Sequence, residues 1–118
     1  MMGKMSEWRD QYVVWHATRA PLPVAVGEKT CQKIIFSGRV QKVGFRLELY
    51  TLASRLGLVG TVKNLPNGDV EAILQGAASQ LSFLIEHMHR LKRACVDKII
   101  VHELPLITDE YFEIAPSS

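Results

Sequence analysis

Residues 38–46, GRVQKVGFR, concentrate side chains that can hold an anion. The stretch carries three cations, Arg39, Lys42 and Arg46, and no acid. A guanidinium is a planar two-pronged donor that fits phosphate oxygens. Gly38 and Gly44 permit the close backbone approach that a phosphate-binding loop needs. The stretch is therefore suited to a phosphate-binding loop, although a basic, glycine-flanked stretch before a helix is as often an ordinary turn.

The hydrophobic period changes on the two sides of this loop. From Gln32 onward Ile34 and Phe36 share one face of a period-two pattern, which predicts a strand. After the loop, apolar residues recur at helical spacing and Gly57 is placed as a C-cap, which predicts a helix over 45–56. We place Glu48, Thr51 and Arg55 on the polar face of this helix, away from its apolar stripe. The N–H groups of its first turn and of the loop would then converge on one anion site.

The remaining chain completes an α+β pattern. The stretches LVGTVKN and DVEAILQG read as strands on either side of LPNG, which is typical of a hairpin. A second helix is expected after Ser79, its candidate N-cap, followed by the strand VDKIIVHE and the short strand YFEIA. The order predicts a ferredoxin-like βαββαβ sandwich, with two helices on one face of a mostly antiparallel sheet and a short extra C-terminal strand.

The beginning of the chain differs from the rest. It holds both tryptophans and ends in the proline-containing stretch APLPVAVG, which suits a linker. We therefore predict an N-terminal extension over 1–30 and a compact domain over 31–118. The extension would be an edge strand, a partner-binding segment or a poorly ordered arm, and we expect the arm.

Composition excludes several classes of protein. The chain has 118 residues, of which 47% are hydrophobic and 22% charged, as expected of one globular domain. A net charge of +2 is too small to indicate a nucleic-acid partner. We find no apolar run of the ~20 residues that a membrane span needs, and no secretory signal at the start. We therefore expect a cytoplasmic monomer with no membrane association.

Neither the cysteines nor the histidines indicate a metal site. Cys31 and Cys95 are far apart and lack the spacing of zinc ligands, so we expect two unpaired thiols. They begin the first and fourth predicted strands, which run antiparallel as neighbours, so a disulfide would have to bridge opposite ends of the sheet. We interpret the four histidines, which are His16, His87, His89 and His102, as surface or partly buried residues.

Two separated stretches resemble the signature regions of the acylphosphatase family. GRVQKVGFR is similar to its pattern G-x-V-Q-G-V-x-F-R, and GLVGTVKNLPNGDVEAILQG is similar to G-x-V-x-N-x-x-x-G-x-V. With the closing YFEI, the resemblance extends over about 31 to 115. It implies a ferredoxin-like enzyme that hydrolyses small acyl phosphates to a carboxylate and inorganic phosphate without a metal or cofactor.

The resemblance also implies a role for each site residue. Arg46 matches the catalytic arginine that binds the phosphoryl oxygens, and Asn64 matches the asparagine that orients the attacking water. Without the resemblance, Asn64 is better explained as a residue that closes its strand before a turn. Main-chain N–H groups of the loop would complete the phosphate site, from Val40, Gln41, Lys42, Val43, Gly44 and Phe45.

This chain departs from the family pattern at Lys42, where the family usually has glycine, and less consequentially at Leu47 and Thr61. Lys42 motivates an alternative function, a catalytically weak phosphate-binding or regulatory module. An RNA-binding sheet is a further alternative, since ferredoxin-like sheets can present aromatic residues to bases. We disfavour it because Phe36 lies on the face that we expect to be buried.

Overall fold

The computed structural model describes the backbone of residues 4–117 and the side chains of residues 10–117. The elements follow the chain as α1 (Lys4–Arg19), β1 (Lys29–Arg39), α2 (Phe45–Leu56), β2 (Val59–Asn64), β3 (Val70–Ala77), α3 (Ala78–His89), β4 (Cys95–Leu104) and β5 (Phe112–Ile114). The five strands form one sheet in the order β4-β1-β3-β2-β5. Only the β2–β5 pair is parallel among the described strand pairs. Within the described residues, no helix is long and apolar enough to cross a membrane.

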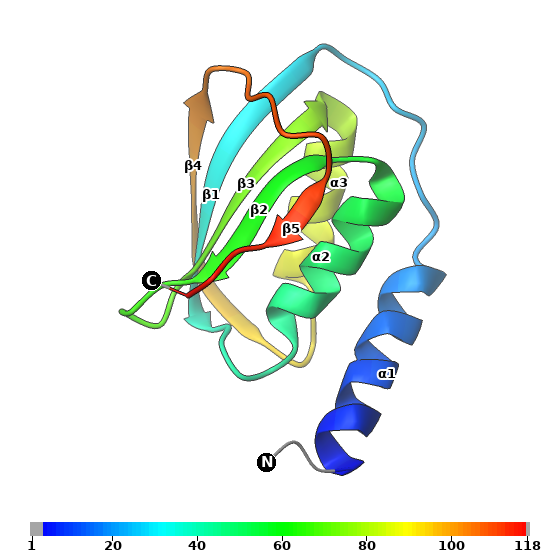
Figure 1. Ribbon diagram of the computed structural model, residues 1–118, viewed down its shortest axis with the longest axis vertical. Coiled ribbons are helices and arrows are strands. Elements are labelled where there is room, and N and C mark those ends of the chain that lie inside the picture. Colours follow the sequence, from blue (N-terminus) through cyan, green and yellow to red (C-terminus); the bar gives the residue numbers. More distant parts are fainter. Residues whose placement is uncertain (1–3, 118) are drawn as a thin grey trace.

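Helices α2 and α3 cover one face of this sheet and enclose the core (Figure 1). Phe45 at the start of α2 packs edge-on against Phe36 of β1, with ring centroids 5.1 Å apart. Phe36 is fully buried, as expected of a residue that faces the helices. The left-handed Gly57 (φ 74°) ends α2 by donating its N–H to the Ala53 and Ser54 carbonyls. The ferredoxin-like arrangement predicted from the sequence is confirmed.

The N-cap predicted for α3 is wrong. The helix begins at Ala78, and Gln80 Oε1 accepts the N–H of Ala77 at 3.1 Å, which satisfies a backbone donor at the helix start. The Ser79 hydroxyl instead accepts from Val26 N–H at 2.7 Å and donates to the Val24 carbonyl at 3.1 Å. Ser79 therefore fastens the 20–28 linker to the sandwich.

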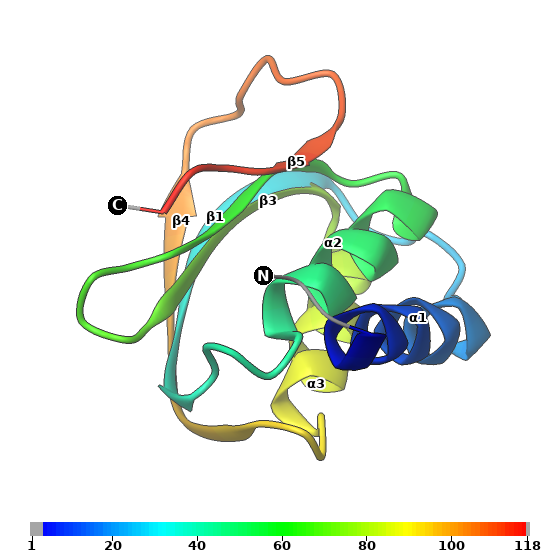
Figure 2. The ribbon, with the colours of Figure 1, turned by 60° about the horizontal axis from the view of Figure 1, so that its bottom comes forward.

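Residues 4–19 form a helix where we expected a poorly ordered arm. Helix α1 packs on the side of α2 (Figure 2) and buries Val13 and Ala17 completely. Arg55 of α2 donates from Nη1 to the carbonyls of Ala17 (2.7 Å) and Ala20 (3.0 Å). These carbonyls lie at the C-terminal end of α1, where a helix has unpaired acceptors and a partial negative charge.

The same packing corrects our placement of the polar face of α2. Glu48 was expected on an outward face, but its side chain is completely buried. Helix α1 covers this face, and the period of α2 gives no sign of a covering element so far away in sequence. The polar residues of α2 therefore make interhelical contacts and are not simply solvated.

The strand register separates the two cysteines. Cys31 is opposite Leu104, whereas Cys95 is opposite Arg39 at the other end of the β1–β4 pair. Both thiols are free, Cys31 buried and Cys95 exposed. Burial, with the nearby Asp109 and Glu103 carboxylates, raises the pKa of the Cys31 thiol.

We expect an aromatic disulfide reagent to modify one thiol rapidly in native protein and a second only on unfolding. The reason is that only the thiolate reacts, and Cys31 is both enclosed and harder to ionise. The Cys95→Ser variant should lose the rapid phase alone. Absence of reactive thiols in the unfolded, unreduced chain would contradict the register.

Candidate active site

The loop predicted to bind phosphate forms one wall of a cavity. Residues 40–44 connect β1 to α2, and beside them lies a pocket of about 300 Å³. Most of the predicted site residues line it: Val40, Lys42, Gly44, Phe45, Arg46 and Asn64. Gln41 and Val43 do not line it. The sequence motif and its partner asparagine are thus brought together from the ends of β1 and β2.

The Gln41 side chain explains how the loop and Asn64 come to share this pocket. Its Nε2 donates to the carbonyls of Leu65 (2.8 Å) and Asp69 (2.9 Å) at the two sides of the β2–β3 hairpin. Leu65 directly follows Asn64, the last residue of β2. Gln41 therefore attaches the loop to the hairpin, and in this way it positions the loop beside Asn64.

Arg46 and Asn64 offer complementary polar groups to the pocket. Arg46 stands in the first turn of α2, where free N–H groups and the helix dipole favour an anion. Asn64 Oδ1 is buried and accepts no hydrogen bond from the part of the chain that the structure describes. Leaving a buried acceptor without a partner costs roughly 1–3 kcal/mol, so such atoms are often kept for function.

Lys42 has the backbone conformation that glycine tolerates best. Its φ is 65°, and it is the one non-glycine residue with a positive φ in the described segment. A side chain in this left-handed region costs about 1 kcal/mol or somewhat more. The departure from the family pattern therefore strains the loop, whatever its ammonium contributes.

We expect Lys42→Gly to raise the free energy of unfolding by about 1 kcal/mol, because it relieves that strain. Turnover should stay within about tenfold, or ~1.4 kcal/mol in barrier, and inorganic phosphate should inhibit somewhat less well. Lys42→Ala is the matched control, since it removes the ammonium and keeps the strained Cβ. Urea denaturation and steady-state kinetics measure both effects. A loss of activity as large as that of Arg46→Ala would make Lys42 itself catalytic.

Three residues line the pocket without having been predicted there. Asp10 reaches it from α1, Leu47 from α2 and Ile114 from β5. No motif signals Asp10, because its position depends on how α1 packs against α2. The pocket wall thus includes part of the N-terminal extension.

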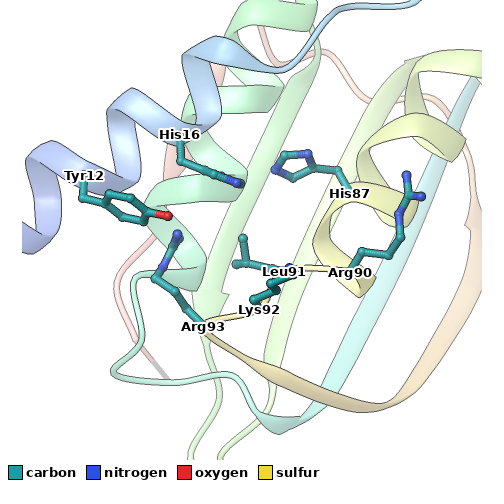
Figure 3. A pocket seen from close by; sticks show the side chains of 7 residues that line it. All are labelled: Tyr12, His16, His87, Arg90, Leu91, Lys92 and Arg93. Carbon is teal, nitrogen blue, oxygen red and sulfur yellow. The ribbon is translucent and has the colours of Figure 1, made fainter.

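A second polar cluster lies between the three helices. His16 of α1, Glu48 of α2 and His87 of α3 place possible ligand atoms within 4.8 Å of one another. The two imidazoles point toward each other (Figure 3), and both line a cavity of about 430 Å³. Two imidazoles and a carboxylate could hold a metal ion. However, the Arg93 guanidinium contacts Glu48 at 2.7 Å, and Arg90 and Lys92 line the same cavity. This concentration of positive charge opposes cation binding.

The chain is similar in sequence and in structure to known proteins. The sequence profile of the family called Acylphosphatase matches residues 32–114. A protein of Acaryochloris marina named acylphosphatase is 44% identical over 85 residues, covering 71% of this chain and 91% of that protein. Acylphosphatase structures from Coxiella burnetii and Bacillus subtilis are each 32% identical, with TM-scores of 0.70. They cover 74% and 75% of this chain and 93% and 99% of their own chains.

Proposed function

We propose a mechanism from one premise: the chain belongs to the acylphosphatase family and is an enzyme that hydrolyses acyl phosphates to a carboxylate and inorganic phosphate. In this mechanism Arg46 and the loop N–H groups bind the phosphoryl oxygens, and Asn64 orients the attacking water.

The observation that carries the proposal is that a guanidinium and a buried amide oxygen line one pocket. Arg46 and Asn64 both line it, and Asn64 Oδ1 is a buried acceptor with no hydrogen-bond partner among the described residues. Phosphoryl transfer needs charge stabilisation on the oxygens and a water in line with the leaving group. A guanidinium and an amide oxygen supply these two functions.

The proposed reaction is a single displacement at phosphorus. Water oxygen forms a bond to phosphorus while the bond from phosphorus to the acyl oxygen breaks, and its electron pair leaves with the carboxylate. Asn64 accepts a hydrogen bond from the water but is a poor base. The water proton therefore goes to a phosphate oxygen of the substrate. Because a carboxylate is a good leaving group, no strong general acid is required.

We propose that residues 31–118 form the catalytic domain, with 1–30 as an extension that packs on it. The net charge of +2 supports a small acyl phosphate as the partner, in preference to nucleic acid. We propose further that the enzyme works as a monomer in the cytoplasm.

Hydrolysis of an ultraviolet-absorbing aryl acyl phosphate by purified full-length protein tests the mechanism. We expect turnover that a metal chelator does not abolish and that inorganic phosphate inhibits competitively. Phosphate binding without measurable turnover would instead favour the catalytically weak phosphate-binding module that Lys42 suggests. The absence of both would contradict the site.

A further inference from the structure

Glu48 is a fully buried carboxylate held by side chains from three separate parts of the fold. Arg93, which follows α3, donates from Nη2 to Oε1 at 2.7 Å. His16 Nδ1 of α1 and His87 Nε2 of α3 contact Oε2 at 2.6 and 2.7 Å. Burial alone would raise the carboxyl pKa of Glu48, but the hydrogen bonds from His87, Arg93 and His16 outweigh it and lower that pKa. Glu48 is therefore an anion in the folded protein.

Arg93 connects this anion to the phosphate-binding loop. While Nη2 contacts Glu48, the Nε of the same guanidinium donates to the Val43 carbonyl at 3.1 Å. The fork geometry of arginine allows both bonds at once. The Arg93 guanidinium also lies over the Tyr12 ring at 5.4 Å, so α1 contributes to holding it (Figure 3).

The bond to Val43 determines where the next N–H points. In a trans peptide, the carbonyl of one residue and the N–H of the next point in opposite directions. With the Val43 carbonyl turned toward Arg93, the Gly44 N–H is turned away from it. Gly44 lines the active-site pocket and Val43 does not.

Helix α1 approaches the loop closely at Gly44. A Cβ added to Gly44 would lie 2.7 Å from Val13 Cγ2 of α1 and 3.7 Å from Arg93 Nε. A side chain at position 44 would therefore clash with α1, so only glycine allows the loop and the helix to approach this closely. Helix α1 thus lies directly against the peptide whose carbonyl accepts from Arg93.

We propose that Arg93, oriented by Glu48, is a positioning residue that aims the Gly44 N–H at the phosphoryl group. The inference rests on the proposed function of the loop, and it adds residues that the family motifs do not contain. Neither Arg93 nor Glu48 touches substrate. Both act through the Val43–Gly44 peptide, and His16 and His87 complete the hydrogen bonding of Glu48.

The matched substitutions Arg93→Lys and Arg90→Lys test this role. Both arginines line the same cavity, but Arg90 is exposed and its partner is Glu86 at 3.5 Å. A lysine at 93 keeps the charge beside Glu48 yet lacks the fork that reaches both Glu48 and Val43. We expect Arg93→Lys to weaken inhibition by inorganic phosphate about tenfold and to lower kcat/KM at least as much. Arg90→Lys should leave both within about twofold, an effect typical of an exposed site.

Stability and coupling separate positioning from a general loss of structure. Urea denaturation should show Arg93→Lys fully folded under assay conditions. Glu48→Gln should weaken phosphate binding in the same direction, and the double variant should lose little more than Arg93→Lys alone, because the two residues act in series. Additive losses, or Arg93→Lys kinetics equal to those of Arg90→Lys, would overturn the inference.

The affinity for inorganic phosphate, measured by calorimetry, shows whether this inference or the proposed function has failed. If the parent binds phosphate without turnover, the hydrolytic mechanism fails, and the affinities of the Arg93 and Glu48 variants still decide the inference. If the parent is active and Arg93→Lys binds phosphate equally well, the inference alone fails. If the parent does not bind phosphate at all, both fail.

Discussion

Replacing Arg46 with alanine should lower kcat/KM for an aryl acyl phosphate by about 10³-fold or more. Removing one preorganised donor from a developing oxyanion typically costs 10²–10³-fold, and a guanidinium offers two donors and a full charge. Because a phosphate clamp acts on the bound substrate and on the transition state, KM should rise while kcat falls. Initial-rate kinetics over a range of substrate concentrations separates the two changes.

Arg39→Ala is the matched control for this experiment. Arg39 belongs to the same basic stretch, but it is exposed at the end of β1 and does not line the pocket. Its removal should change kcat/KM by less than about threefold, as expected for a screened surface charge. Equal losses from the two variants would mean that the general positive charge of the stretch, and not a positioned guanidinium, binds the substrate.

The sandwich could be predicted because its signals are local. The helix over 45–56 begins and ends where the apolar spacing and Gly57 indicated. The β2–β3 hairpin followed from its short LPNG connection, and the ferredoxin-like arrangement followed from the order of the elements and the packing of two helices on one sheet. The spacing of the two motifs also identified the family before any contact was known.

What sequence reasoning missed depends on contacts between distant residues. Helix α1 buries only Val13 and Ala17 completely among its described residues, while Tyr12 and Trp15 stay exposed, so its apolar face is too narrow to recognise. Its attachment relies on Arg55 and Glu48, and these contacts span 38 and 32 sequence positions. No local sequence pattern encodes these contacts. For the same reason Glu48 was expected on an outward face, although its side chain is buried.

Asn64→Ala should chiefly lower kcat, by about 10²-fold, and leave KM within about threefold. The reason is that a hydrogen bond to the attacking water matters in the transition state more than in substrate binding. The free energy of unfolding of this variant also distinguishes a catalytic role of Asn64 from a role in closing its strand. Its buried Oδ1 has no hydrogen-bond donor among the residues that the structure describes, so its loss should not lower the free energy of unfolding.

Asn67→Ala provides the contrasting structural control in the same hairpin. Asn67 Oδ1 accepts the N–H of Asp69 at 3.0 Å and its Nδ2 donates to the Asp69 carboxylate, so this variant should lose about 1 kcal/mol of stability and keep its turnover. Opposite effects of the two asparagines, one on kcat and one on urea denaturation, would support water orientation by Asn64. If Asn64→Ala raises KM with kcat intact, or unfolds as easily as Asn67→Ala while staying active, Asn64 closes its strand and another group orients the water.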